Sequence, residues 1–246
     1  MSPAAPVPDN PASTPTIARS TAYDRQLLRI LLIVSLATGI VDAVCLVNFK
    51  VFTAYMTGTL IVIGIHLGGA TPLALPALLA LAAFGIGATI GGRLVRREKR
   101  AALTHIRMLA QALTVVTGLV LIAVGCAVRA DVNDVGLPQY VCISLLGIAM
   151  GIQVAGSRQA GLLDMAIPAA TMVLHGIFFD SRLAGGKAER QGRRMAVIIA
   201  LVVGAVIGAG LSHWHAWCGL LAGAAVLAIA TAAAYALARQ PLSATS

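Results

Sequence analysis

The sequence predicts an all-α transmembrane protein with about six spanning helices. Of its 246 residues, 59% are hydrophobic and only 11% are charged, and the apolar residues gather in long stretches. A soluble domain carries about 25% charged residues, which it needs to cover its surface. A helix that crosses a bilayer needs about 20 mostly apolar residues, and several stretches reach that length. The lipid bilayer is therefore the first expected partner, and no soluble catalytic domain is expected.

The apolar stretches predict six full spans and two shorter segments. The spans are expected at residues 27–48, 73–95, 107–128, 138–157, 194–212 and 215–238. The shorter segments, 51–67 and 167–180, contain glycine and polar residues that suit exposure to lipid poorly. We therefore expect each short segment to be interrupted, and to be shielded from lipid by the long helices.

Composition also predicts how the chain is divided. Residues 1–22 are rich in Pro, Ala, Ser and Thr and have no hydrophobic periodicity, so a disordered N-terminal tail is expected there. Two membrane repeats are expected to follow, at residues 23–130 and 131–240. Residues 241–246 form a short C-terminal tail.

A glycine motif recurs in the two halves. Residues 87–91 read Gly-Ala-Thr-Ile-Gly and residues 204–208 read Gly-Ala-Val-Ile-Gly. The same shift pairs the two short segments and places Gly39 on Gly156. If the short segments do not cross the membrane, each half holds three spans, and an odd number of spans inverts the second copy. The pattern predicts a 3+3 inverted repeat whose short segments pack against each other near the midplane.

The basic residues predict the topology, because Lys and Arg are enriched in cytoplasmic loops. If both short segments dip into the membrane and return, all of the 18 Lys and Arg residues except Lys50 and Arg129 face one side. If both segments cross, the charges divide almost evenly. The first arrangement predicts a multi-pass protein of the inner or plasma membrane with both termini cytoplasmic. A seven-span arrangement with the N-terminus outside stays open as the alternative.

The basic loop at residues 93–100 is the strongest topological anchor. It contains Arg93, Arg96, Arg97, Lys99 and Arg100. Orientation is one reading of this loop, and binding of anionic lipid head groups is the other. The formal net charge of +9 does not predict nucleic-acid binding, because the basic residues lie in short loops between apolar stretches.

The sequence carries no motif for catalysis or for a cofactor. Its four cysteines lie within or at the edges of apolar stretches, and none forms a CxxC pair, so no metal site is expected. No phosphate-binding loop or nucleophile–base pair is recognisable. We therefore expect a protein that is not an enzyme and has no cofactor.

Asp42 is the first candidate for a functional residue. A carboxylate in the middle of a membrane costs about 2.5–3.5 kcal/mol on insertion scales, so it usually faces the protein interior and marks a pathway or a partner. Asp42 is predicted to face the interior, where it could couple transport to H⁺ or a cation. The alternative is that it lies near the end of its span, solvated or paired with Lys50.

The two short segments supply further candidates. Thr57, Gly58 and Thr59 offer hydroxyl groups and a glycine that lets the backbone open toward a polar ligand. The alternative is close helix packing around Gly58. In the second segment His175 precedes Gly176, and it is either a proton relay or a hydrogen-bonded packing residue.

Gln153 and Arg158 are polar residues at the end of the fourth predicted span. Arg158 is expected either to extend toward the cytoplasmic interface or to pair with Asp164 or an anionic substrate. Gln153 is a candidate for the solute pathway, since an amide in an apolar span needs a polar partner.

Two stretches of the first half resemble a known family. Residues 39–43, Gly-Ile-Val-Asp-Ala, and residues 52–58, Phe-Thr-Ala-Tyr-Met-Thr-Gly, resemble the G-x-x-D-A and M-T-G-N stretches of the YoaK family, the DUF1275 integral membrane proteins. In the second half, residues 151–155 with Arg158 and Thr171 resemble that family's M-Q-N-A-x-x-R and T-T-x-x-T-G stretches. The resemblance covers about residues 27–238. It adds Thr171 to the candidate site residues.

The resemblance implies an integral membrane architecture and no settled biochemical activity. Three residues depart from the family pattern: Thr59 and Val154 stand where asparagine is usual, and His175 replaces the threonine before Gly176. If the family's polar residues bind a ligand, these departures imply a different ligand, or none, in this chain.

The sequence therefore predicts a small-solute transporter or permease with a polar site at the repeat interface. The alternative is a non-transporting scaffold or a subunit of a membrane complex, in which the polar residues serve only packing. The expected partners are lipid and an unknown small solute or ion. The oligomeric state is left open, with a homo-oligomer among the candidates.

Overall fold

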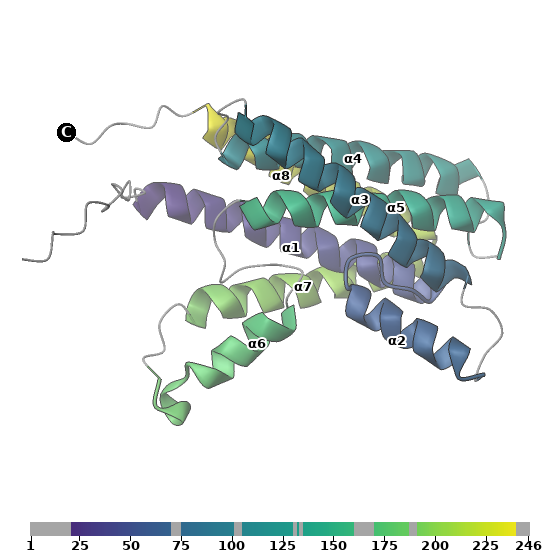
Figure 1. Ribbon diagram of the computed structural model, residues 1–246, viewed down its shortest axis with the longest axis horizontal. Coiled ribbons are helices and arrows are strands. Elements are labelled where there is room, and N and C mark those ends of the chain that lie inside the picture. Colours follow the sequence, from purple (N-terminus) through teal and green to yellow (C-terminus); the bar gives the residue numbers. More distant parts are fainter. Residues whose placement is uncertain are drawn as a thin grey trace, which may run out of the picture.

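The computed structural model describes residues 21–69, 75–100, 105–129, 132, 135–159, 170–186 and 191–239, and these parts are helical with short connections. The helices are α1 (Thr21–Phe49), α2 (Met56–Leu67), α3 (Leu75–Arg100), α4 (His105–Arg129), α5 (Leu137–Gln159), α6 (Ala170–Phe179), α7 (Gln191–Ser212) and α8 (Ala216–Ala238), with a 3₁₀ turn η3 at Arg182–Ala184. Figure 1 shows the long helices as one bundle, with α2 and α6 on its flank.

Six of these helices are long and apolar enough to cross a membrane. They are α1, α3, α4, α5, α7 and α8, which confirms the six predicted spans. The ends differ where polar residues continue a helix: α1 begins at Thr21, inside the predicted tail, and α3 continues to Arg100, through the predicted basic loop. Residues 1–20 and 241–246 of the predicted tails lie outside the described residues.

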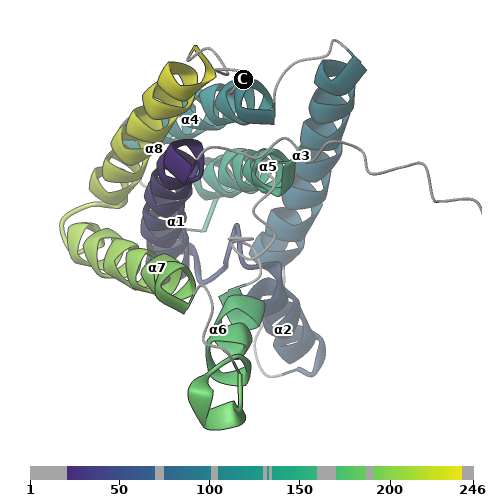
Figure 2. The same ribbon diagram turned by 90° about the vertical axis from the view of Figure 1, so that its left-hand side faces the viewer.

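The long helices pack in a regular set of pairs. The most extensive contacts join α3 to α5, α1 to α7, and α4 to α8, followed by α4 to α5 and α1 to α8. Seen from the end of the bundle, α1 and α5 lie between α7 on one flank and α3 on the other (Figure 2). The centre of the molecule is therefore formed by α1, α4, α5 and α8.

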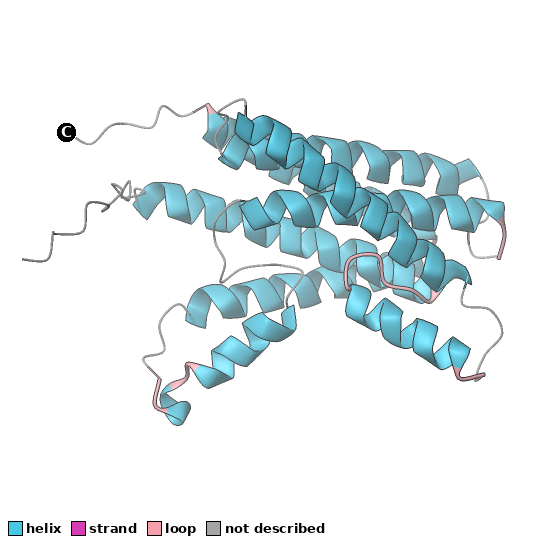
Figure 3. Ribbon diagram, viewed as in Figure 1, coloured by secondary structure: helices cyan, strands magenta, loops and turns pink. Residues whose placement is uncertain are grey.

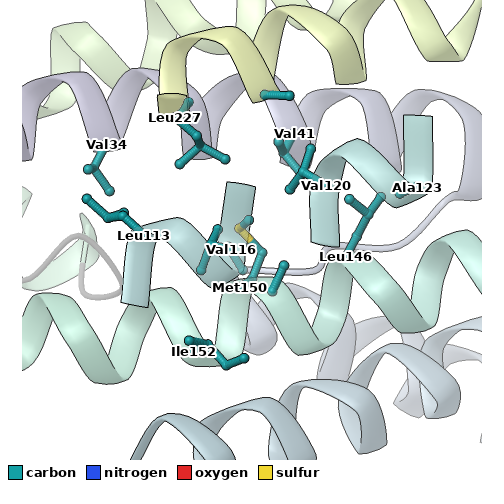
Figure 4. Packing of buried hydrophobic residues seen from close by; sticks show 14 of the residues in the cluster. Val34, Val41, Leu113, Val116, Val120, Ala123, Leu146, Met150, Ile152 and Leu227 are labelled. Carbon is teal, nitrogen blue, oxygen red and sulfur yellow. The ribbon is translucent and has the colours of Figure 1, made fainter. Parts of the chain in front are cut away.

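The core is built from branched aliphatic side chains and alanine. Figure 4 shows Val34 and Val41 of α1, Leu113 and Val116 of α4, and Met150 of α5 converging between the helices. All five are fully buried. Residues spaced three, four or seven apart lie on one face of a helix, so the apolar spans bring their small and branched residues to a shared interior.

Glycines bring two helix pairs into backbone contact. At Gly204 and Gly208 of α7, an added Cβ would overlap backbone atoms of Leu36 and Ile40 in α1. At Gly87 of α3, it would overlap the backbone of Ile148 in α5. This close packing agrees with the use of small residues at helix crossings in membranes.

The two short segments differ from the prediction. The helical parts, α2 and α6, are continuous, and their main neighbours are α3 for α2 and α7 for α6, not each other. The apolar residues of both helices are largely exposed, for example Ile61 at 61% and Phe178 at 67%. The expected shielding by the long helices is therefore wrong for α2 and α6, although Val51, Thr53 and Ala54 at the start of the first segment are buried.

The non-helical backbone lies before α2, at residues 50–55, and not at Gly58. Figure 3 shows this connection folded back against the bundle between the end of α1 and the start of α2. From their first turns, α2 and α6 diverge toward opposite ends of the bundle (Figure 1). The end of α2 points toward the end of the bundle where α1 ends, and the end of α6 points toward the end where α7 begins (Figure 1).

Candidate functional site

Asp42 lies in the last two turns of α1 and is 4% exposed. Its Oδ1 accepts hydrogen bonds from the backbone N–H of Thr53 at 2.8 Å, from the Thr53 hydroxyl at 2.9 Å and from the N–H of Ala54 at 2.9 Å. Its Oδ2 accepts from the N–H of Tyr55 at 3.1 Å. The carboxylate faces the interior, as predicted, and it does not pair with Lys50, whose ammonium group donates to the Val47 carbonyl.

The partners of Asp42 explain how a loop can lie inside this bundle. Residues 50–55 are not helical, and Val51, Thr53 and Ala54 are buried. Buried backbone groups need partners where water is excluded. Asp42 supplies them for three successive N–H groups, and the Thr59 hydroxyl both accepts from Phe52 N–H at 3.2 Å and donates to Phe52 carbonyl at 2.7 Å.

Asp42 and Thr59 thus hold the backbone N–H groups of residues 52–55 with two side chains. The carboxylate also lies at the N-terminus of α2, where a negative charge interacts favourably with the helix dipole. Gly58 packs against the ring of Phe52, since an added Cβ would lie 2.6 Å from a ring carbon. Gly58 is therefore a site of close packing, which was the alternative interpretation of this residue. Thr57 lies on an exposed face.

A second polar contact joins α1 to α5 inside the core. The Gln153 amide donates from Nε2 to Thr38 Oγ1 at 2.6 Å, and the Thr38 hydroxyl donates to the Val34 carbonyl at 2.8 Å. Thr38 is 1% exposed and Gln153 is 2% exposed. Within the described residues, Gln153 Oε1 and the fully buried Ser35 Oγ have no hydrogen-bond partner.

These polar residues share one face of α1. Ser35, Thr38 and Asp42 are spaced i, i+3 and i+7, which places them in one stripe along the helix. The stripe begins beside the loop at residues 52–55 and reaches the contact with Gln153. Sequence reasoning found Asp42 and Gln153 and missed Ser35, Thr38 and Thr53, although the polar spacing within an apolar span was a usable signal.

A third polar group fixes α6 to α7. The Arg194 guanidinium donates to the Gly176 carbonyl at 2.8 Å and forms an ion pair with Asp180. The Gln191 amide donates to the Ile177 carbonyl at 3.1 Å. The Gly176 carbonyl also accepts from the Asp180 N–H at 3.1 Å, and the donors from α7 add to the partners of the last carbonyls of α6. Gly176 allows this approach, because an added Cβ would lie 2.8 Å from the guanidinium.

The remaining predicted residues are on exposed faces. His175 stacks on Phe179 of the same helix, with ring centroids 5.3 Å apart, and both are exposed. Thr171 and Arg158 are also exposed, and Asp164 lies outside the described residues. The described part of the chain contains no group of three potential metal ligands. Asp42 is therefore buried, whereas Thr57 and His175 lie on exposed faces.

Replacing Arg194 by Gln is expected to release α6 from α7 and to lower the free energy of unfolding by about 1.5–3 kcal/mol, because a hydrogen bond from a charged donor is lost. Hydrogen exchange over residues 170–180 should accelerate. Arg193→Gln, which changes a neighbouring charge on the same helix, is the matched control. Equal exchange in the two variants would contradict a role for Arg194 in fixing α6.

Comparison with known proteins agrees with this architecture. No curated protein and no solved structure matches the chain. The model of a family of proteins of unknown function, DUF1275, matches residues 30–233, from the third turn of the Asp42 helix to the last turns of α8. Because this match covers most of the sequence, the chain belongs to the DUF1275 family of polytopic membrane proteins.

Proposed function

We propose that this protein is a transporter of a small solute whose polar site lies where α1 and α5 cross. The observation that carries the proposal is the buried contact between Thr38 and Gln153, beside acceptor atoms that lack partners in the described residues. A buried polar group without a hydrogen bond is costly, so such groups in a native protein require a reason. A solute that supplies the missing hydrogen bonds is such a reason.

The polar atoms without partners at this site favour a solute with a positive charge or with hydrogen-bond donors. Gln153 Oε1 is an acceptor, the Ser35 hydroxyl can accept, and the Asp42 carboxylate adds negative charge on the same helix face. Asp42 itself is engaged by four donors, so we assign it to the architecture of the site and not to proton exchange.

The pattern of helix contacts supports a 3+3 inverted repeat, which is part of this proposal. The pair α3–α5 has its equivalent in α7–α1, α4–α5 in α8–α1, and α2–α3 in α6–α7. In inverted-repeat transporters the site lies between the repeats near the midplane, where here α1 and α5 meet. The repeats are the predicted 23–130 and 131–240.

The glycine contacts support one register for the proposed repeat. An added Cβ at Gly39 would meet the backbone of Leu201 in α7, and one at Gly151 would meet the backbone of Phe84 in α3. Gly39 therefore corresponds to Gly151 and not to Gly156, which instead faces Ala112 of α4. In this register the stretch Gly-Ile-Val-Asp-Ala of α1 corresponds to Gly-Ile-Gln-Val-Ala of α5.

The distribution of charge supports an orientation in the inner or plasma membrane with both termini on the cytoplasmic side. The start of α1, the end of α3 and the start of α7 lie at the same end of the bundle (Figure 1). Those helix ends carry arginine, including Arg25, Arg93 and Arg193, whereas Lys50 and Arg129 lie near the other end. An excess of Lys and Arg is typical of the cytoplasmic side.

A non-transporting scaffold is the second candidate function. One observation favours it: Thr57 and His175 lie on exposed faces, and Asp42 is occupied by the 52–55 loop, so these three residues do not form the shared cavity that a transporter led us to expect. In a scaffold, the Thr38–Gln153 contact would only fix how α1 packs on α5.

Uptake by proteoliposomes distinguishes the two functions. We expect purified protein to accumulate at least one member of a panel of small cations and amines above empty liposomes. Gln153→Leu is expected to reduce that uptake by about tenfold or more while changing the melting temperature little, because the Thr38 hydroxyl keeps its hydrogen bond to the Val34 carbonyl and the unpartnered Gln153 Oε1 is removed.

Thr114→Val is the control for this experiment, because Thr114 bonds to the Ala110 carbonyl and Tyr235 hydroxyl in a different helix pair. It should transport as the unmodified protein does. Full uptake by Gln153→Leu would remove the proposed site, and the absence of uptake across the panel would favour the scaffold.

A further inference from the structure

A groove at the end of the α3 span combines small residues with arginine. It has a volume of about 450 Å³ and is lined by Ala88, Thr89, Gly92, Arg93 and Arg96. The span of α3 ends at Arg96, so the groove begins within the apolar part of the helix and ends where that part stops. No residue of this groove belongs to the Thr38–Gln153 site.

The two arginines in the groove give it positive charge. Arg93 and Arg96 are three residues apart, and residues at this spacing are neighbours on one helix face. Both are exposed, and neither pairs with a carboxylate in the described part of the chain. A guanidinium binds phosphate oxygens through two parallel hydrogen bonds, so a pair of them suits a phosphate group.

The rest of the groove is apolar and open. Ala88 and Gly92 lie one turn apart, and nothing lies within 4 Å of a Cβ added at Gly92. The Thr89 hydroxyl is turned back to the Gly85 carbonyl at 2.9 Å, which leaves its methyl group on the exposed face. Ile86 and Ile90, 53% and 43% exposed, continue the apolar surface.

We propose that this groove binds an anionic phospholipid, with the phosphate of the head group on Arg93 and Arg96 and the first part of an acyl chain along Ala88 and Gly92. The residues follow the same order as the parts of a lipid: the arginines lie at the end of the span, where the head group lies, and the apolar surface lies within the span, where the acyl chain lies. A basic patch beside a transmembrane helix is a recognised site for anionic head groups. A free phosphate ion would use the arginines but not the apolar part.

The test is lipid retention measured by native mass spectrometry on the full chain in detergent, with phosphatidylglycerol and phosphatidylcholine offered at equal concentration. The unmodified protein should retain phosphatidylglycerol in preference to phosphatidylcholine. The double variant Arg93→Gln/Arg96→Gln should lose that preference by about fivefold or more, given the contribution of each basic residue near an anionic surface. Arg129→Gln, at the opposite end of the bundle, is the control for charge and should retain the preference.

Gly92→Leu separates a groove from a merely charged surface. It fills the groove without changing charge, and its Cβ meets no neighbour, so the melting temperature should be kept while phosphatidylglycerol retention falls. Retention equal to that of the unmodified protein in Gly92→Leu or in the double variant would overturn the proposal. Inorganic phosphate at millimolar concentration is offered separately, and displacement of the lipid by phosphate would identify an ion site in place of a lipid site.

Discussion

Asp42→Ala is expected to lower the free energy of unfolding by about 3–5 kcal/mol, because it removes the acceptor of several buried backbone donors. The substitution leaves the N–H groups of Thr53, Ala54 and Tyr55 without their acceptor. Each unsatisfied buried donor costs about 1–3 kcal/mol. The loop at residues 50–55 should then open, and the start of α2 should lose its position against α1.

Asp42→Asn is expected to fall between the unmodified protein and Asp42→Ala. One oxygen of the amide can still accept from the donors of Thr53 and Ala54, but the amide NH₂ cannot accept from Tyr55 N–H. Thermal unfolding in detergent and hydrogen exchange over residues 50–58 measure both variants. Thr57→Ala, an exposed change on α2, is the matched control and should stay within about 0.5 kcal/mol of the unmodified protein. Equal melting of Asp42→Ala and Thr57→Ala would refute this role.

This result bears on how any loss of transport in Asp42 variants is understood. A carboxylate that holds the loop can abolish uptake by unfolding the loop, with no part in ion coupling. Gln153→Leu does not carry this ambiguity, because the Gln153 amide donates to the Thr38 hydroxyl and its replacement leaves no backbone donor behind. For this reason the uptake test of the α1–α5 site uses Gln153.

The spans could be predicted from the sequence because a single physical requirement controls them. About 20 apolar residues are needed to cross the hydrocarbon layer, and six stretches meet that length. The helix ends could not be predicted as well. In α3 the arginines beyond Val95 have good helix propensity and continue the helix to Arg100, past the point where apolar residues end.

The structure of the short segments was harder to predict, because a glycine within an apolar stretch can either open the backbone or allow close packing. In the first segment Gly58 was expected to open the backbone, but it lies inside α2 and makes room for the Phe52 ring. The opening comes at residues 50–55, where the sequence contains no glycine and where the acceptor is a carboxylate from the preceding helix. Such a partner depends on how the chain turns, which hydrophobic spacing does not encode.

Only part of the candidate site could be predicted, because some of its residues can be recognised only from how the helices pack. Asp42 and Gln153 stand out in apolar spans, since their side chains need partners there. Thr38 and Ser35 do not stand out, because serine and threonine in helices usually bond to the carbonyl one turn earlier. Thr38 does so through Val34 and still accepts from Gln153, while Ser35 does not. Only the packing of α1 on α5 distinguishes the two.

Gly204→Val is expected to prevent α7 from packing on α1. The added Cβ would overlap the Leu36 carbonyl oxygen and would lie 3.0 Å from the Leu36 carbonyl carbon and 3.1 Å from the Ile40 nitrogen. These are backbone atoms of a helix, so no side-chain rotation can relieve the overlap. Overpacking against movable side chains already costs about 1–3 kcal/mol, and we expect a larger loss here, seen as a low yield of monodisperse protein.

Gly210→Val is the matched control, because it places the same side chain in the same helix where nothing lies within 4 Å of the added Cβ. Gly87→Val and Gly85→Val form the corresponding pair in α3: Gly87 lies against the Ile148 backbone in α5, and Gly85 has open space. In size-exclusion profiles and melting temperatures, Gly204→Val should be less stable than Gly210→Val, and Gly87→Val should be less stable than Gly85→Val. If Gly204→Val behaved like Gly210→Val, the two helices would not be in backbone contact. If only one of the two pairs separated, the equivalence of α3 with α7 on which the inverted repeat depends would fail.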